Sequence, residues 1–234
     1  MQTVPSILEK TPEDLFFQIN RLSKYFPRFQ IDIADGIFVP NKTVQIEELF
    51  NMKTVFNKDS LLFDFHLMVK DYEAEIKKIE KLKEIIKINY IFIHFSAIKN
   101  PRSFARLQLA QDDNGGGTIG LTLNPKDKVD DLTSHYNLKQ IPLIQIMSVT
   151  PGVQGNPFLP DTLKKIEQLR ILGYRKEIFL DGAVNEKTIP IILSKKYQPD
   201  FICPGSYLTK TKTLKENVKY LKGLSHSREG GNPD

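Results

Sequence analysis

The chain has 234 residues, 40% of them hydrophobic, so it can bury a full-size core as one domain and has the length of a single α/β barrel. Lys and Arg number 33 against 28 Asp and Glu, but the excess is scattered, which gives nucleic-acid binding little support and makes an anionic small substrate the easier partner to propose. The single cysteine, Cys203, excludes an intramolecular disulfide and a cysteine-cluster metal site, and it is expected to pack in the core. The chain shows neither a charged-then-apolar leader nor an apolar run approaching ~18 residues, so we expect a cytoplasmic protein with no membrane partner.

Short β-branched or aromatic runs alternate with charged stretches whose apolar residues recur every three or four positions, which is the βαβα pattern of a parallel sheet. The predicted strands are residues 3–8, 29–33, 61–68, 90–96, 117–123, 143–149, 177–180 and 200–203. The predicted helices are residues 12–25, 71–85, 101–110, 129–136, 160–172, 186–194 and 213–224. Eight such strands in a chain of this length favour a closed (β/α)₈ TIM barrel over an open doubly wound sheet.

We expect one catalytic domain over residues 1–224 and a disordered C-terminal tail over residues 225–234, where apolar periodicity stops. The glycine-rich stretch 112–117 is not followed by a predicted helix. It is therefore predicted to be a flexible turn and not a phosphate-binding loop.

Polar side chains are expected at the ends of the predicted strands, where a TIM barrel places its reactive groups. These residues are Asp32, His66, Ser96, Asn124 and Asp181, with Met147 late in its strand. Asp32 alternates with two isoleucines in an apolar run, and a carboxylate there is costly unless it has a partner. From this segment alone, Asp32 is either a functional acid or a satisfied polar residue beside an Asp35-Gly36 turn.

Asp32, His66 and Asp181 come from three predicted strands whose ends converge. Taken singly, His66 has the simpler interpretation of a core histidine, but two carboxylates with an imidazole form a reasonable ligand set for a divalent ion. Two carboxylates on opposite sides of a substrate also suit proton removal on one face and proton return on the other, with a metal stabilising the enediolate between them. That is the chemistry of inverting a carbon next to a carbonyl.

Glycine-containing turns follow the last three predicted strands. They comprise Gly152, Val153, Gln154 and Gly155, then Gly182 and Ala183, then Gly205 and Ser206. A substrate phosphate is held by backbone N–H groups, and TIM barrels often hold it after the last two strands. The alternative is that these glycines only form tight turns.

Several segments of the chain resemble the ribulose-phosphate 3-epimerase family of the ribulose-phosphate-binding barrel superfamily. The resemblance spans residue 4 to about residue 208 and rests on residues 5–8 (PSIL), 32–41 (DIADGIFVPN), 65–69 (FHLMV), 120–125 (GLTLNP), 147–152 (MSVTPG) and 181–182 (DG). It implies an isomerase of the pentose phosphate pathway that inverts C3 of a ketose phosphate, converting D-ribulose 5-phosphate to D-xylulose 5-phosphate or acting on a close analogue. The implied partner is a phosphorylated ketose, with homo-oligomerisation possible.

The resemblance also implies roles for single residues. Asp32 and Asp181 match paired acid/base aspartates that also bind a metal, and His66 matches a metal-ligand histidine. Substrate-binding positions of the family are matched by Ser6, His66, Met68, Met147, the turn from Gly152 through Val153 and Gln154 to Gly155, Gly182, Ala183, Gly205 and Ser206. The implied cofactor is a divalent ion, either Zn, Fe, Mn or Mg.

The chain departs from the family pattern at several of these places. Gln30 stands where the family has a second ligand histidine, and an amide oxygen is a weaker ligand, so Gln30 is expected to be a weak metal ligand. Ala34 replaces a methionine, Ser96 replaces a glutamate, and Ala183 replaces the second glycine of an Asp-Gly-Gly turn, where a φ above zero would strain it. Two alternatives therefore stay open, a phosphosugar-binding barrel with impaired catalysis and an epimerase of a different ketose phosphate.

Overall fold

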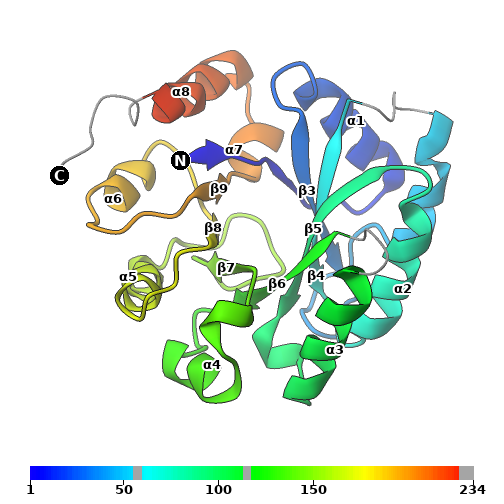
Figure 1. Ribbon diagram of the computed structural model, residues 1–234. Helices are drawn as coiled ribbons and strands as arrows, with labels where there is room; N and C mark the ends of the chain where they lie inside the picture. The colour runs from blue at the N-terminus through cyan, green and yellow to red at the C-terminus, as the bar shows by residue number, and fades with distance from the viewer. Residues whose placement is uncertain (55–59, 113–116, 227–234) are drawn as a thin grey trace.

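The computed structural model describes residues 1–54, 60–112 and 117–226, which form one barrel of strands surrounded by helices (Figure 1). Within these residues nine strands make one sheet, in which every pair of hydrogen-bonded neighbours is parallel. Their order is β1-β9-β8-β7-β6-β5-β4-β3-β2. The strands are β1 (Gln2–Thr3), β2 (Ser6–Ile7), β3 (Arg28–Ala34), β4 (Leu62–Met68), β5 (Lys87–His94), β6 (Thr118–Leu123), β7 (Leu143–Met147), β8 (Glu177–Asp181) and β9 (Phe201–Cys203).

The two outer strands of this order, β1 and β2, are halves of one interrupted strand. Pro5 between them lacks an N–H donor, so the regular ladder breaks there. On one side Val4 N donates to Ile202 O at 3.0 Å, and on the other side Gln30 N donates to Pro5 O at 2.9 Å. The first strand therefore bonds to both β9 and β3 and closes the ring, which confirms the predicted (β/α)₈ barrel and corrects the predicted strand 3–8 to two short pieces.

The helices lie around the outside of the barrel (Figure 1). They are α1 (Pro12–Leu22), α2 (Tyr72–Leu82), α3 (Pro101–Asp112), α4 (Val129–His135), α5 (Leu163–Ile171), α6 (Ile189–Leu193), α7 (Ser206–Thr209) and α8 (Leu214–His226), with 3₁₀ turns at Ile46–Thr54, Phe95–Ala97, Leu138–Gln140 and Pro160–Thr162. Thr11 caps α1 by accepting from Asp14 N, and Pro12 occupies the first turn, where its missing N–H costs nothing. In the described ranges no helix combines the length and the apolar composition that a bilayer crossing requires.

Several helix boundaries differ from the predicted ones; for example, α1 and α2 end at Leu22 and Leu82 and not at residues 25 and 85. The predicted helix 186–194 is reduced to α6, because the side chain of Asn185 accepts from the N–H groups of Lys187 and Thr188 and forms a turn there. A 3₁₀ turn begins the predicted helix 160–172. Helix α8 continues through residues 225 and 226 of the predicted tail. Residues 227–234 of that tail, and residues 113–116 of the predicted glycine-rich turn, lie outside the described part of the chain.

The barrel interior at the start of the strands holds an ion pair among aromatic rings. Nε and Nη2 of Arg28 each lie 2.8 Å from Oδ2 of Asp64, and Asp64 Oδ1 accepts from Tyr90 N. The guanidinium group lies 4.6 Å from the ring centre of Tyr90 and 5.1 Å from that of Phe201. Burial raises the pKa of Asp64 to about 6 although Arg28 acts in the opposite direction. This pair fills the end of the barrel opposite the strand ends that carry Asp32 and Asp181.

Candidate active site

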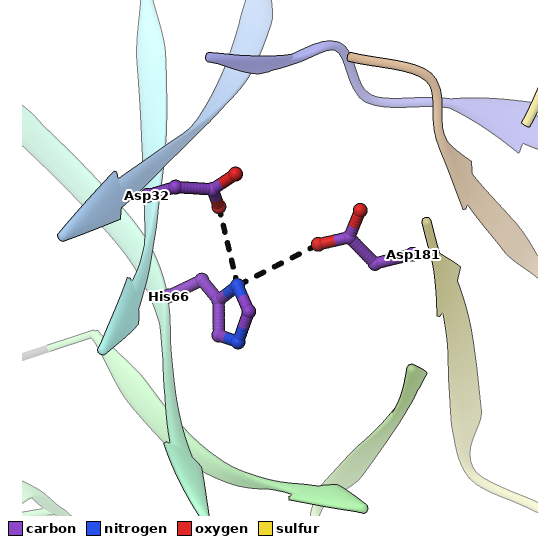
Figure 2. Close-up of side chains that lie close together, drawn as sticks. All are labelled: Asp32, His66 and Asp181. Atoms are coloured by element: carbon purple, nitrogen blue, oxygen red, sulfur yellow. Dashed lines mark hydrogen bonds and ion pairs between the residues drawn. The ribbon is translucent and has the colours of Figure 1, made fainter. Parts of the chain in front are cut away.

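The predicted triad comes together inside the barrel. Asp32 on β3 is the direct neighbour of His66 on β4 in the strand register, and Asp181 is the last residue of β8. His66 Nδ1 lies 3.2 Å from Asp32 Oδ1 and 3.5 Å from Asp181 Oδ2, so the imidazole faces both carboxylates (Figure 2). All three residues are buried, and their possible ligand atoms lie within 4.8 Å of one another. Asp32 and His66 lie two residues before the ends of their strands and not at the ends as predicted.

The side-chain amides of two buried glutamines donate hydrogen bonds to the carboxylates of the triad. Gln30 precedes Asp32 by two residues and therefore points to the same face of β3. Its Nε2 donates to Asp32 Oδ1 at 3.0 Å and to Asp181 Oδ2 at 2.7 Å. Gln145 on β7 also donates to Asp181 Oδ2, at 3.2 Å. The triad is thus fixed by a network of amide and imidazole groups.

The acid pair shares one buried environment. Burial, together with the negative charge of Asp32, raises the pKa of Asp181, while His66 and the N–H groups of Gln30 and Gly182 act in the opposite direction. Next to them His66 Nε2 lies 2.9 Å from His94 Nε2, and burial and His66 lower the pKa of His94. A buried carboxyl group with a raised pKa beside a second carboxyl group suits a site where one group gives a proton and the other takes one.

A pocket opens above the triad at the carboxyl ends of the strands. All the residues expected to contact substrate line it: Ser6, His66, Met68, Met147, Gly152, Val153, Gln154, Gly155, Gly182, Ala183, Gly205 and Ser206, together with Asp32 and Asp181. Gln30 lies beneath the pocket and is completely buried. Ala34 is buried in a small apolar cluster with Val39 and Met68.

Sequence reasoning did not assign Gln145 and Cys203 to this site. Cys203 is buried as expected, but it also lines the pocket, and its Sγ donates to Gln30 Oε1 at 3.6 Å. The signal for Gln145 was its place two residues before Met147, on the same face of an apolar strand. In the described part of the chain, Ser96 and Asn124 bond to each other and do not line the pocket.

The turn after β7 packs closely on the segment that follows β3. Gly152 has φ +101°, and a Cβ added there would lie 2.6 Å from Val39 Cβ. Asn41 Nδ2 donates to Gly152 O at 2.7 Å and holds the two segments together. Only glycine fits at residue 152, because both the positive φ and the close approach exclude a side chain.

Ala183 is the one non-glycine residue with positive φ among the described residues, at +51°. Its carbonyl oxygen accepts from Asn185 Nδ2 at 2.9 Å and from Thr188 Oγ1 at 2.7 Å, so its surroundings impose the conformation. The strain anticipated for an alanine at this turn is therefore present.

Ala183→Gly is expected to raise the free energy of unfolding by about 0.5–1 kcal/mol. Glycine removes the steric cost of a left-handed backbone conformation, but it also increases the conformational entropy of the unfolded chain, which offsets part of the gain. The matched control is Gly173→Ala, since Gly173 has φ +87° and open space around an added Cβ. That variant should lose about 1 kcal/mol by strain alone. Urea unfolding measures both, and a destabilised Ala183→Gly variant would contradict the expectation.

Comparison with known proteins adds to this geometry. The model of the ribulose-phosphate 3 epimerase family matches residues 2–208. Ribulose-phosphate 3-epimerase from Helicobacter pylori is 31% identical over 231 residues, which cover 97% of this chain and 99% of the relative. The enzyme of the same name from Methanocaldococcus jannaschii is 30% identical over 199 residues, covering 83% and 77%. Among solved structures, 3-keto-L-gulonate-6-phosphate decarboxylase from Vibrio cholerae superposes with a TM-score of 0.64 at 13% identity, covering 95% of this chain and 97% of the other, a likeness of fold.

Proposed function

Because the chain belongs to the ribulose-phosphate 3 epimerase family, we propose that it converts D-ribulose 5-phosphate to D-xylulose 5-phosphate, or inverts C3 of a close analogue. It is an isomerase that acts on a carbohydrate phosphate. The observation that carries the proposal is the pair of buried carboxyl groups on β3 and β8, which face one pocket from two sides of the barrel. The single buried cysteine supports a reducing compartment, so we place the enzyme in the cytoplasm.

The reaction requires one carboxylate and one carboxylic acid. The carboxylate takes the proton from C3, the C–H electron pair forms the C2–C3 double bond, and the carbonyl electrons move to O2 as an enediolate. The other carboxyl group then returns a proton to C3 from the opposite face, which inverts the centre and leaves the two groups with exchanged protonation. Asp32 and Asp181 are the groups we assign to the two faces.

The residues of the triad also fit a divalent ion, since two carboxylate oxygens and an imidazole nitrogen converge within 4.8 Å. Asp32, His66 and Asp181 would hold it, with Gln30 as a weak further ligand. When bound, such an ion supplies positive charge that stabilises the enediolate oxygens.

We assign the phosphate group of the substrate to the glycine-containing turns. The turns at residues 152–155, 182–183 and 205–206 line the pocket, and backbone N–H groups of such turns suit a phosphate. Ser6, Met68 and Met147 line the same pocket, and we assign them to contacts with the sugar. A phosphorylated ketose thus spans the pocket from the turns to the acid pair.

Solvent exchange tests the proposal. In D₂O the enzyme should incorporate deuterium at C3 of D-ribulose 5-phosphate and form C3-deuterated D-xylulose 5-phosphate, followed by NMR. Binding of the substrate without deuterium incorporation would favour the phosphosugar-binding barrel. Faster exchange into a hexulose 6-phosphate than into the pentulose would favour the epimerase of a different ketose phosphate.

A further inference from the structure

We propose that the carboxamide of Gln30 works in two orientations. With no ion bound, its N–H₂ group donates to the two carboxylates, and with a divalent ion bound, its oxygen becomes a ligand. The filled site then has three oxygen ligands and one nitrogen ligand, which lowers its selectivity for Zn²⁺ over Mn²⁺ relative to a site with a second histidine. The proposal concerns the site of the proposed function and rests on that assignment.

The N–H₂ group of Gln30 points at the two carboxylates of the triad. Nε2 of Gln30 lies 2.7 Å from Asp181 Oδ2 and 3.0 Å from Asp32 Oδ1. These are the same two oxygens that face His66 Nδ1, at 3.5 Å and 3.2 Å. A cation held by these oxygens and this nitrogen would therefore meet the positive end of the amide. The amide must turn for the cation to be accepted.

Rotation of the Gln30 amide costs little free energy on the side of the amide oxygen. Gln30 Oε1 accepts from Cys203 Sγ at 3.6 Å. A thiol is both a weak donor and a weak acceptor, so after a half-turn about the terminal C–C bond the N–H₂ group can donate to the sulfur. The nitrogen and oxygen of an amide are nearly equal in size, so the exchange needs no additional space in a residue that is completely buried.

The histidine pair permits the same reversal. Without an ion, His66 Nδ1–H donates to Asp32 and Nε2 accepts from His94 Nε2, which lies 2.9 Å away. With an ion, the Nδ1 lone pair faces the metal and Nε2–H donates to His94. A neutral imidazole carries its proton on either nitrogen, so His66 can adopt the tautomer that each state requires. An orienting partner behind a ligand histidine is usual in metal sites.

The chemistry of the donors gives the selectivity. Zn²⁺ binds more tightly than Mn²⁺ at almost any such site, so the informative quantity is the ratio of the two affinities. Imidazole favours Zn²⁺, whereas carboxylate and carbonyl oxygens suit Mn²⁺ and Mg²⁺. Gln30→His is therefore expected to raise the Zn²⁺-to-Mn²⁺ affinity ratio by about tenfold or more.

The test measures ion binding by the full chain after chelator treatment, with Mn²⁺ followed by electron paramagnetic resonance and Zn²⁺ by competition against it. Gln30→Met is the matched control for orientation, because methionine has a similar length but offers Mn²⁺ no oxygen. If Gln30 ligates the ion, Gln30→Met lowers Mn²⁺ affinity by about tenfold. If the amide stays in its donor orientation, the same variant raises Mn²⁺ affinity, because the opposing N–H₂ group is gone, and the proposal is overturned.

An unchanged ratio of Zn²⁺ affinity to Mn²⁺ affinity in Gln30→His also overturns the proposal. If thermal unfolding shows that Gln30→Met does not fold, the result for Gln30→His decides alone. Failure of the proposed function is recognised separately. Deuterium exchange into D-ribulose 5-phosphate by the unmodified chain reports catalysis, whereas the affinity ratio reports the ligand set whether or not turnover occurs.

Discussion

Asp181→Asn is expected to lower turnover of D-ribulose 5-phosphate by more than about 10³-fold, the scale expected when a general acid or base is lost. The amide has nearly the shape of the carboxyl group but neither takes nor gives a proton at neutral pH. Asp32→Asn should have an effect of the same size. The control is Asp161→Asn, which changes an exposed carboxylate paired with Lys164 and should leave turnover within about twofold.

Deuterium exchange separates the two faces of the reaction. If each carboxyl group serves one face, one of the two variants should exchange deuterium only into D-ribulose 5-phosphate and the other only into D-xylulose 5-phosphate, both without net epimerisation. Steady-state turnover and NMR of the recovered sugars give the two readings. Near-normal turnover in either Asp32→Asn or Asp181→Asn would contradict the two-carboxylate mechanism.

Arg28→Met is expected to lower the free energy of unfolding by about 3–5 kcal/mol, because it leaves a buried carboxylate without its cation. Asp64 is completely buried, and both Arg28 nitrogens that contact it lie at 2.8 Å. Methionine fills a similar volume among the aromatic rings, so lost packing contributes little. Urea unfolding followed by circular dichroism measures the change.

Two further variants make this expectation specific to the charge. Adding Asp64→Asn to Arg28→Met should recover part of the loss, because the unpaired charge is then removed. Arg102→Met changes an exposed arginine and should stay within about 0.5 kcal/mol of the unmodified chain. A double variant less stable than Arg28→Met would show that packing, and not the buried charge, dominates at this end of the barrel.

The triad was predictable because parallel strands bring their carboxyl ends to one edge, and Asp32, His66 and Asp181 each stand late in an apolar run. Gln145 and the partnership of Arg28 with Asp64 were not predictable in this way. Whether a polar residue within an apolar strand points into the barrel or toward the helices depends on strand tilt and stagger, which no single segment contains.

Details of the backbone were likewise predictable only where residues within one turn determine them. Prolines and capping residues gave the start of α1 closely, because they act within one turn. The φ of +51° at Ala183 and the shortening of the predicted helix 186–194 depend on hydrogen bonds to Asn185 and Thr188, whose side chains could equally have faced solvent. Two departures from the family pattern nevertheless marked unusual positions. Gln30 donates a hydrogen bond to Asp181, and Ala183 has a positive φ.

The divided first strand has a consequence for when the pocket forms during synthesis of the chain. Gln2 and Thr3 are synthesised long before β9, the strand with which they pair and which ends at Cys203. The ring therefore cannot close until β9 has been synthesised, and pairings of such long sequence separation form slowly. Ser6, in this first strand, lines the same pocket as Asp181 in the strand beside β9. The nascent chain consequently carries both carboxyl groups before the pocket that they share with Ser6 can form.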